Sequence, residues 1–203
     1  GPLTLEVAQW ETPVLIDETA PMTLTPQEGI GIAVDVGTTT IAVQSLDLRS
    51  GHVLGVQTAL NAQARYGSDL MSRIEAAVMQ GKQEELTQIL RDQIGTLCQK
   101  SLPEGESTPP EAVRRIVLVG NTVMHHFFSG LPLNGLAVAP FQPADPGPQR
   151  FSGQQLGWRF APDAEVLFLP CLGGFVGSDL LAGPLALHLH ETPRPADLID
   201  LGT

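Results

Sequence analysis

The chain has 203 residues, enough for one large domain or two small ones with a full hydrophobic core. Its formal net charge is −11 with only 11 Lys and Arg, which argues against a nucleic-acid partner and against an anionic membrane. No apolar run approaches the roughly 20 residues that a membrane helix needs, so no membrane partner is expected. Nucleotide binding stays open, because backbone N–H groups and a metal ion can hold a phosphate without a basic surface.

The two cysteines, Cys98 and Cys171, belong to no C-x-x-C or other metal-binding spacing. The sequence therefore supports neither a zinc site nor an iron–sulfur cluster, and both thiols are expected to be reduced structural residues. Together with an amino terminus that lacks a signal-peptide pattern, this predicts a cytoplasmic protein.

Residues 1–28 are rich in proline and show no long periodicity. They are interpreted as an extended lead-in or the end of a preceding domain, with one short strand near residues 14–16. From residue 29 the pattern changes to alternating β-branched residues, which predicts strands at about 30–36, 39–46 and 52–58. Three consecutive strands joined by tight turns form an antiparallel meander.

The rest of the chain alternates between helix and strand. In chain order the periodicity predicts helices at 68–79 and 82–100, a strand at 114–119, a helix at 123–129, a strand at 165–169, a helix at 177–188 and a strand from 198. Residues 130–163 contain many Pro and Gly residues and are predicted to be mostly irregular. The order indicates an α/β fold whose first strands are antiparallel and whose later strands are parallel through crossovers.

Residues 35–40, with the sequence DVGTTT, lie where the first predicted strand turns back into the second. Gly37 allows backbone N–H groups to approach a phosphate closely, and the hydroxyls of Thr38, Thr39 and Thr40 add donors. Asp35, at the strand end, can hold a hydrated Mg²⁺ ion against the phosphates and is a candidate catalytic residue. The alternative is an ordinary β-hairpin with a glycine turn, which would require neither the acid nor three threonines.

A partial second copy of this turn occupies Asp200, Leu201, Gly202 and Thr203, again after an apolar strand. Two strand-Asp-x-Gly-Thr turns in one chain are expected when two hairpins face each other across a nucleotide. Asp200, Gly202 and Thr203 are therefore candidate phosphate-binding residues, together with Asn121, which ends a predicted strand.

The first turn resembles the phosphate loop of the superfamily that contains actin, sugar kinases and heat-shock chaperones. Four further segments resemble the carboxy-terminal ATPase domain of the reductive activators of corrinoid proteins; they are NAQARYGSDLMSRI at 61–74, GNTVMHH at 120–126, PFQP at 140–143 and GGFVGSD at 173–179. The resemblance implies a ribonuclease H-like mixed sheet flanked by helices, the first lobe of an actin-like ATPase, over residues 29–203. It also implies that this lobe is truncated at the second phosphate loop.

What the resemblance implies about function is an enzyme that uses ATP and Mg²⁺ to drive electrons onto a cobalt(II) corrinoid protein, restoring cobalt(I). In such relatives an iron–sulfur domain precedes the ATPase region, and this chain has no such cysteine cluster. Adenosine is held there largely by a second lobe, which would follow Thr203. Weak or absent ATPase activity of the chain alone is therefore expected.

Two other functions remain open from the sequence. The same phosphate loop serves small-molecule kinases, which act on sugars or acids. The fold could also serve as a non-enzymatic module that docks a partner or forms a homodimer.

Several polar residues allow two interpretations. Asp179 either stabilises a helix start or orients water or magnesium, and Asn121 either caps a helix or lines the cleft. Asp69 and Arg73 have the spacing of a local ion pair on one helical face. His125 and His126 are expected to pack rather than to bind metal.

Overall fold

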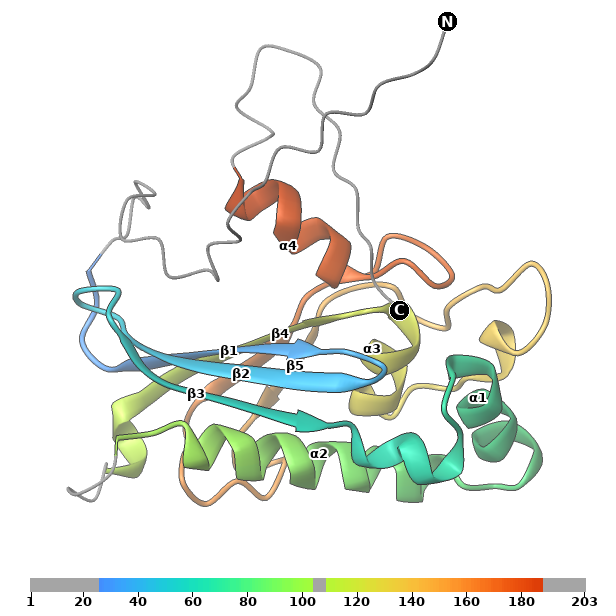
Figure 1. Ribbon diagram of the computed structural model, residues 1–203, viewed down its shortest axis with the longest axis horizontal. Coiled ribbons are helices and arrows are strands. Elements are labelled where there is room, and N and C mark those ends of the chain that lie inside the picture. The colour runs from blue at the N-terminus through green and yellow to red at the C-terminus, as the bar shows by residue number, and fades with distance from the viewer. Residues whose placement is uncertain (1–25, 104–108, 188–203) are drawn as a thin grey trace, which may run out of the picture.

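The computed structural model describes residues 26–103 and 109–187, which form a mixed six-stranded sheet in the order β3-β2-β1-β4-β6-β5 (Figure 1). The strands are β1 (Ile30–Val36), β2 (Thr40–Asp47), β3 (Val53–Leu60), β4 (Val113–Gly120), β5 (Gln149–Ser152) and β6 (Glu165–Phe168). Helices flank the sheet, so the expected α/β class with a mixed sheet is confirmed.

The first three strands form the predicted antiparallel meander, with β1 paired to β2 and β2 to β3. Their alternation explains the pairing, because Ile32, Val34 and Val36 of β1 are buried while Ala33 and Asp35 are exposed. One face of the meander therefore faces the core, and Asp35 lies on the opposite face.

Strand β4 pairs parallel with β1 on one side and with β6 on the other, as the predicted crossovers require. The edge strand β5 pairs antiparallel with β6 and lies within the stretch that was predicted to be irregular. That prediction was wrong for β5. The strand has only four residues and is stabilised by a partner that follows it in the chain, so local sequence carries little signal for it.

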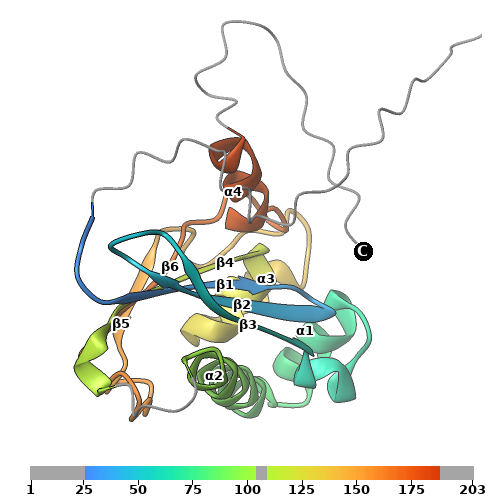
Figure 2. The same cartoon turned by 60° about the vertical axis from the view of Figure 1, so that its left-hand side comes forward.

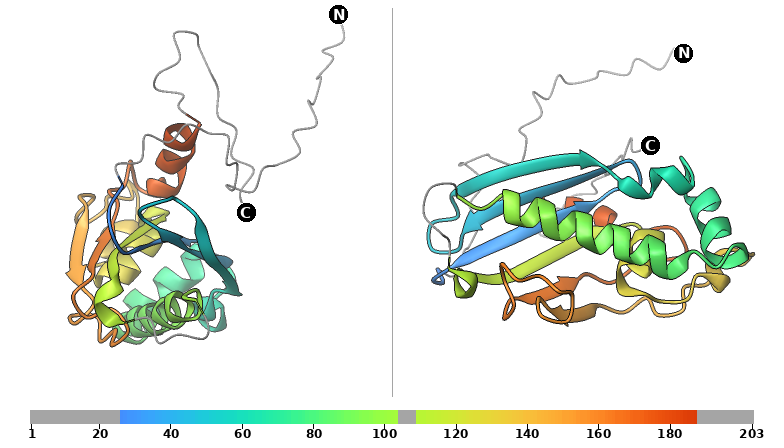
Figure 3. Two further views of the ribbon diagram at one scale, coloured as in Figure 1. Left: turned by 90° about the vertical axis from the view of Figure 1, so that its left-hand side faces the viewer. Right: turned by 90° about the horizontal axis from the view of Figure 1, so that it is seen from below.

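Helices cover both faces of the sheet (Figure 2). They are α1 (Leu70–Met79), α2 (Gln83–Lys100), α3 (Thr122–Ser129) and α4 (Ser178–Ala186), with short 3₁₀ turns η1 (Ala62–Tyr66), η2 (Pro110–Ala112) and η3 (Asn134–Leu136). The long helix α2 crosses beneath β2 and β3 and packs against α3, whereas α4 contacts β4 from the other side (Figure 3).

The core between the sheet and its lower helices is aromatic and aliphatic. Phe127, Phe128 and Phe168 are fully buried, together with Leu90 and Ile94 of α2. Burying an aliphatic or aromatic side chain of this size contributes about 1.5–3 kcal/mol. This packing fixes α3, and with it the carboxyl end of β4, against the sheet.

Some sequence-based expectations lie outside the described residues. These are the lead-in before residue 26, with its strand near residues 14–16, and the strand from residue 198 with the turn Asp200, Gly202 and Thr203. The expected domain boundary at residues 28 and 29 also stays a prediction. None of the described helices has the combined length and apolarity to span a bilayer.

Candidate functional site

Three segments converge at the carboxyl ends of two neighbouring strands. They are the turn of residues 37–39 between β1 and β2, residues 120–122 between β4 and α3, and residues 171–177 before α4. Because β1 and β4 are parallel, both strands deliver their carboxyl ends to the same edge of the sheet. Ligands of open α/β sheets bind at such an edge.

The first segment is the predicted phosphate turn. Thr39 and Thr40 are exposed and Thr38 is half-buried, so their polar groups can be approached from solvent. A Cβ atom at Gly37 would collide with the carbonyl oxygen of Thr40, so the turn closes this tightly only with glycine. Asp35 is exposed just before the turn, beside Val119 of β4.

Asn121 joins the second segment to the first. Its Nδ2 donates to Thr38 Oγ1 at 3.0 Å, and its Oδ1 accepts from the backbone N–H of Met124 at 3.0 Å. The side chain therefore caps α3, as one interpretation expected, and at the same time contacts the turn. Direct contact of Asn121 with a phosphate stays a prediction.

The third segment is tied closely to the end of β4. Thr122 Oγ1 contacts the carbonyl oxygens of Gly173 at 2.6 Å and Val176 at 3.0 Å, while Ser178 Oγ lies 3.3 Å from the backbone N of Gly120. At Gly177 a Cβ would collide with the carbonyl oxygen of Gly120. Only glycine at this position lets α4 begin against β4.

Asp179 lies in the first turn of α4, and its Oδ1 accepts from the N–H of Leu180 at 2.9 Å. An acid at this end of a helix is stabilised by the helix dipole, which fits the structural interpretation. Its role toward water or magnesium stays a prediction.

The structure adds a residue that the sequence did not single out. Asn61 is 1% exposed, and its Nδ2 donates to the carbonyl oxygen of Gly37 at 3.0 Å. The backbone N–H of Asn61 donates to Thr39 O at 2.8 Å. The available signal was its place at the start of the polar segment 61–74, but only the fold brings it beneath the turn.

In the same segment, Asp69 and Arg73 do not form the local ion pair that the sequence predicted. Asp69 caps α1 by accepting from Ser72 N at 2.9 Å, and the ion pairs found among the described residues do not include Asp69 with Arg73. Arg73 is fully buried, and its Nε donates to Gly67 O at 2.9 Å. The two side chains thus shape opposite ends of the loop that leads into α1.

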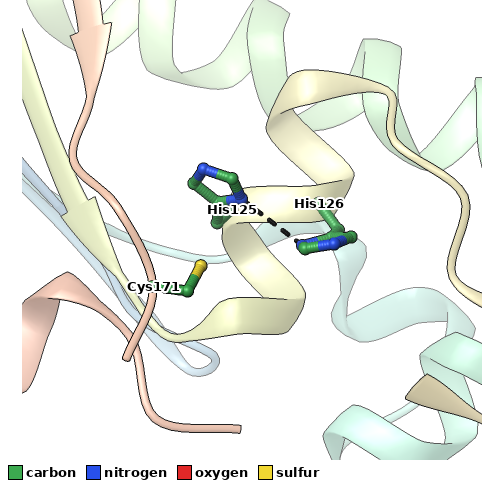
Figure 4. Close-up of side chains that lie close together, drawn as sticks. All are labelled: His125, His126 and Cys171. Atoms are coloured by element: carbon green, nitrogen blue, oxygen red, sulfur yellow. Dashed lines mark hydrogen bonds between the residues drawn. The ribbon is translucent and has the colours of Figure 1, made fainter. Parts of the chain in front are cut away.

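His125 and His126 of α3 lie close to Cys171 (Figure 4). One ligand atom from each lies within 4.8 Å of the others, so the three residues form a candidate metal-binding group within the part of the chain that the structure describes. Cys171 comes from the third segment, so the fold brings together residues that sequence spacing separates. Both cysteines are free thiols.

Hydrogen bonds favour packing over metal binding in this cluster. His126 Nε2 accepts from Ala144 N at 3.0 Å, so its Nδ1 carries the proton and donates to Thr122 O at 2.9 Å. His125 Nε2 donates to Gly147 O at 3.1 Å. His126 therefore has no lone pair left for a metal, and the two rings attach the loop of residues 144–147 to α3.

Residues 30–192 match the family described as the RACo middle region. The chain belongs to this family. The match includes Asp35, the turn, Asn121 and Asp179, and it stops before Asp200.

Two proteins similar to this chain are named for the activation of corrinoid proteins. The corrinoid activation enzyme RamQ of Eubacterium limosum is 33% identical over 178 residues, which cover 85% of this chain and 29% of RamQ. The solved structure of a reductive activator for corrinoid, iron–sulfur protein superposes with a TM-score of 0.74 at 28% identity, covering 83% of this chain and 27% of that one. The chain thus spans less than a third of the length of either protein.

Proposed function

We propose that this RACo middle region chain supplies a phosphate-binding part of an ATP-dependent reductive activator of a corrinoid protein. The observation that carries the proposal is the turn of residues 37–39, fixed from two sides by Asn61 and Asn121 and preceded by the exposed Asp35. Both named relatives act in corrinoid activation, which supports the same assignment.

The residues of the turn suit a nucleotide phosphate. Gly37, Thr38, Thr39 and Thr40 would offer backbone N–H groups and hydroxyls to the phosphate oxygens. Asp35 would hold Mg²⁺ through water, and Mg²⁺ supplies positive charge that stabilises the transferring phosphoryl group. Asp179, in the first turn of α4, would orient a water molecule.

The reaction of the complete protein would couple two processes. ATP and water would give ADP and phosphate, while one electron would reduce a cobalt(II) corrinoid to cobalt(I). The electron would come from an iron–sulfur domain, as the resemblance implies for the parent protein. The corrinoid protein is the proposed partner.

The test uses Asp35→Asn in the complete protein, because this change removes the charge and keeps the side-chain volume. We expect at least about a tenfold loss of MgATP affinity in calorimetry, since the negative charge that faces the hydrated ion is lost. Conversion of the corrinoid spectrum from cobalt(II) to cobalt(I) should also fail.

The matched control is Asp163→Asn, which removes the charge of another exposed aspartate; this residue lies just before β6, at the amino end of the sheet and so opposite the site. It should bind MgATP and activate the corrinoid protein like the wild type. Normal activation and unchanged MgATP affinity in Asp35→Asn would overturn the proposal.

A further inference from the structure

Asn61 contacts the phosphate turn at two points from below. The side-chain Nδ2 donates to Gly37 O at 3.0 Å, and the backbone N–H donates to Thr39 O at 2.8 Å. One residue therefore occupies the carbonyl oxygens of both Gly37 and Thr39.

The orientation of the Asn61 amide is fixed by its surroundings. Its Oδ1 accepts from Gln63 N at 3.0 Å, which caps η1, so Nδ2 must be the group that faces Gly37. The side chain is 1% exposed and also lies 3.5 Å from the sulfur of Met124. The tightly packed side chain of Asn61 therefore cannot rotate away from Gly37.

This contact determines the direction of one backbone donor. In a planar trans peptide, the C=O of one residue and the N–H of the next point in opposite directions. Because Gly37 C=O points to Asn61, the N–H of Thr38 must point away from Asn61, toward the outer side of the turn. That is the side on which a phosphate would lie.

Asn121 contacts the other donor of Thr38, its side-chain hydroxyl. Its Nδ2 donates to Thr38 Oγ1 at 3.0 Å, so the hydroxyl oxygen acts as an acceptor there and its hydrogen remains available to another group. Asn61 thus sets the direction of the Thr38 N–H, and the contact with Asn121 leaves the hydroxyl hydrogen of Thr38 free to donate to another group.

We propose that Asn61 is a positioning residue for phosphate recognition, acting by orienting the Thr38 N–H. The inference rests on the proposed nucleotide function, and it assigns to η1 and the segment that follows a role in shaping the phosphate turn. Asn61 does not touch the ligand itself.

The decisive variant is Asn61→Ser in the complete protein. Serine retains an oxygen that can cap η1 but is too short to reach Gly37 O, and it adds no charge near the phosphate. We expect affinities for ATP and ADP to fall about tenfold, the value of roughly one hydrogen bond. Affinity for adenosine, which has no phosphate, should stay within about twofold of the wild type.

The matched control is Gln93→Ala. Gln93 braces the same segment from α2, since its Nε2 donates to Leu60 O at 2.7 Å and its Oε1 accepts from Ala62 N at 2.8 Å, yet it does not touch the turn. Its loss should leave the ratio of ATP to adenosine affinity unchanged. A shift of that ratio equal to the shift in Asn61→Ser would overturn the proposal.

If Asn61→Ser does not fold, Asn61→Thr replaces it, because threonine also keeps an oxygen that can cap η1, is too short to reach Gly37 O and adds no charge. Equal losses for ATP and adenosine, or no loss for ATP, in the folded variant would refute the positioning role. Failure of the wild-type protein to bind ATP would instead refute the proposed function itself. The two failures are therefore distinguishable.

Discussion

The imidazole of His125 is held in its neutral form by its surroundings. Burial lowers its pKa from 6.5 to about 4, and the neighbouring His126 adds to this effect, while the hydrogen bond to Gly147 and the charge of Asp145 act in the opposite direction. Burial also lowers the pKa of His126. The ring of His126 must stay uncharged to keep the hydrogen bond that its Nε2 accepts from Ala144 N.

These two pKa shifts predict a loss of stability in mild acid. Between pH 6.5 and about 4 the unfolded chain binds a proton at residue 125 that the folded chain does not, so the free energy of unfolding must fall as the pH falls. The contribution of His125 is on the order of 3 kcal/mol and levels off below about pH 4. About 2 kcal/mol of this loss falls between pH 7 and pH 5, where urea unfolding measures it.

The control is the variant His125→Phe, which retains a ring beside Phe168 and cannot titrate. Its free energy of unfolding should depend less on pH than that of the wild type over the same range. Equal pH dependence in the two proteins would contradict the assignment of this effect to His125.

At the scale of the elements, periodicity predicted most of the fold because most elements bury one regular face. In α2, Leu86, Leu90, Ile94 and Leu97 recur at helical spacing and are all buried. Strand β5 has no such face of its own, since it exists through its pairing with β6. Sequence periodicity cannot report a strand whose stability comes from a distant partner.

In the candidate site, too, features that are local in sequence could be predicted, whereas contacts between distant segments could not. The tight turn at Gly37 between β1 and β2 could be predicted, because a turn is continuous in sequence and has a distinctive composition; its role in phosphate binding stays a prediction. Asn61 and the meeting of Cys171 with His125 could not, because they depend on how η1 and the loop before α4 fold back on the sheet. Contacts across elements carry no spacing signal in one chain.

Gly95 lies in the middle of α2, and replacing it with alanine should destabilise the protein, although helix propensity alone would predict the opposite. Alanine would ordinarily stabilise a helix interior by about 0.5–1 kcal/mol relative to glycine. Here a Cβ would lie 2.5 Å from Nε1 of the buried Trp158, whose indole also donates to Arg91 O at 3.2 Å. The overpacking cost of about 1–3 kcal/mol should exceed the helix gain.

We therefore expect Gly95→Ala to lower the free energy of unfolding by about 1–2 kcal/mol, measured by urea denaturation. Thr96→Ala, at the exposed next position of the same helix, is the control and should change it by less than about 0.5 kcal/mol. A stabilised Gly95→Ala would show that Trp158 does not pack against α2 as described.

At the scale of the whole molecule, the polar groups at the edge of the sheet suit the phosphates of the proposed nucleotide better than its base. The turn, the start of α3 and the loop before α4 all lie at one edge of the sheet, and their polar groups suit oxygen atoms. Since the relatives are more than three times as long as the matched region, most of their chain lies outside this comparison. Under the proposed function, a further lobe would recognise adenosine, as the sequence resemblance to actin-like ATPases implies.

If phosphates and adenosine are bound by different parts of the complete protein, the chain alone should have only part of its affinity for MgATP. The 203-residue chain should bind MgATP at least about 100-fold more weakly than the complete protein, a difference of roughly 3 kcal/mol, because it would lack the contacts to adenosine. Titration calorimetry of both proteins at the same Mg²⁺ concentration measures the difference, and thermal unfolding verifies that the shorter chain is folded. Equal affinities would mean that the edge described here recognises the whole nucleotide, and the two-lobe interpretation would then be wrong.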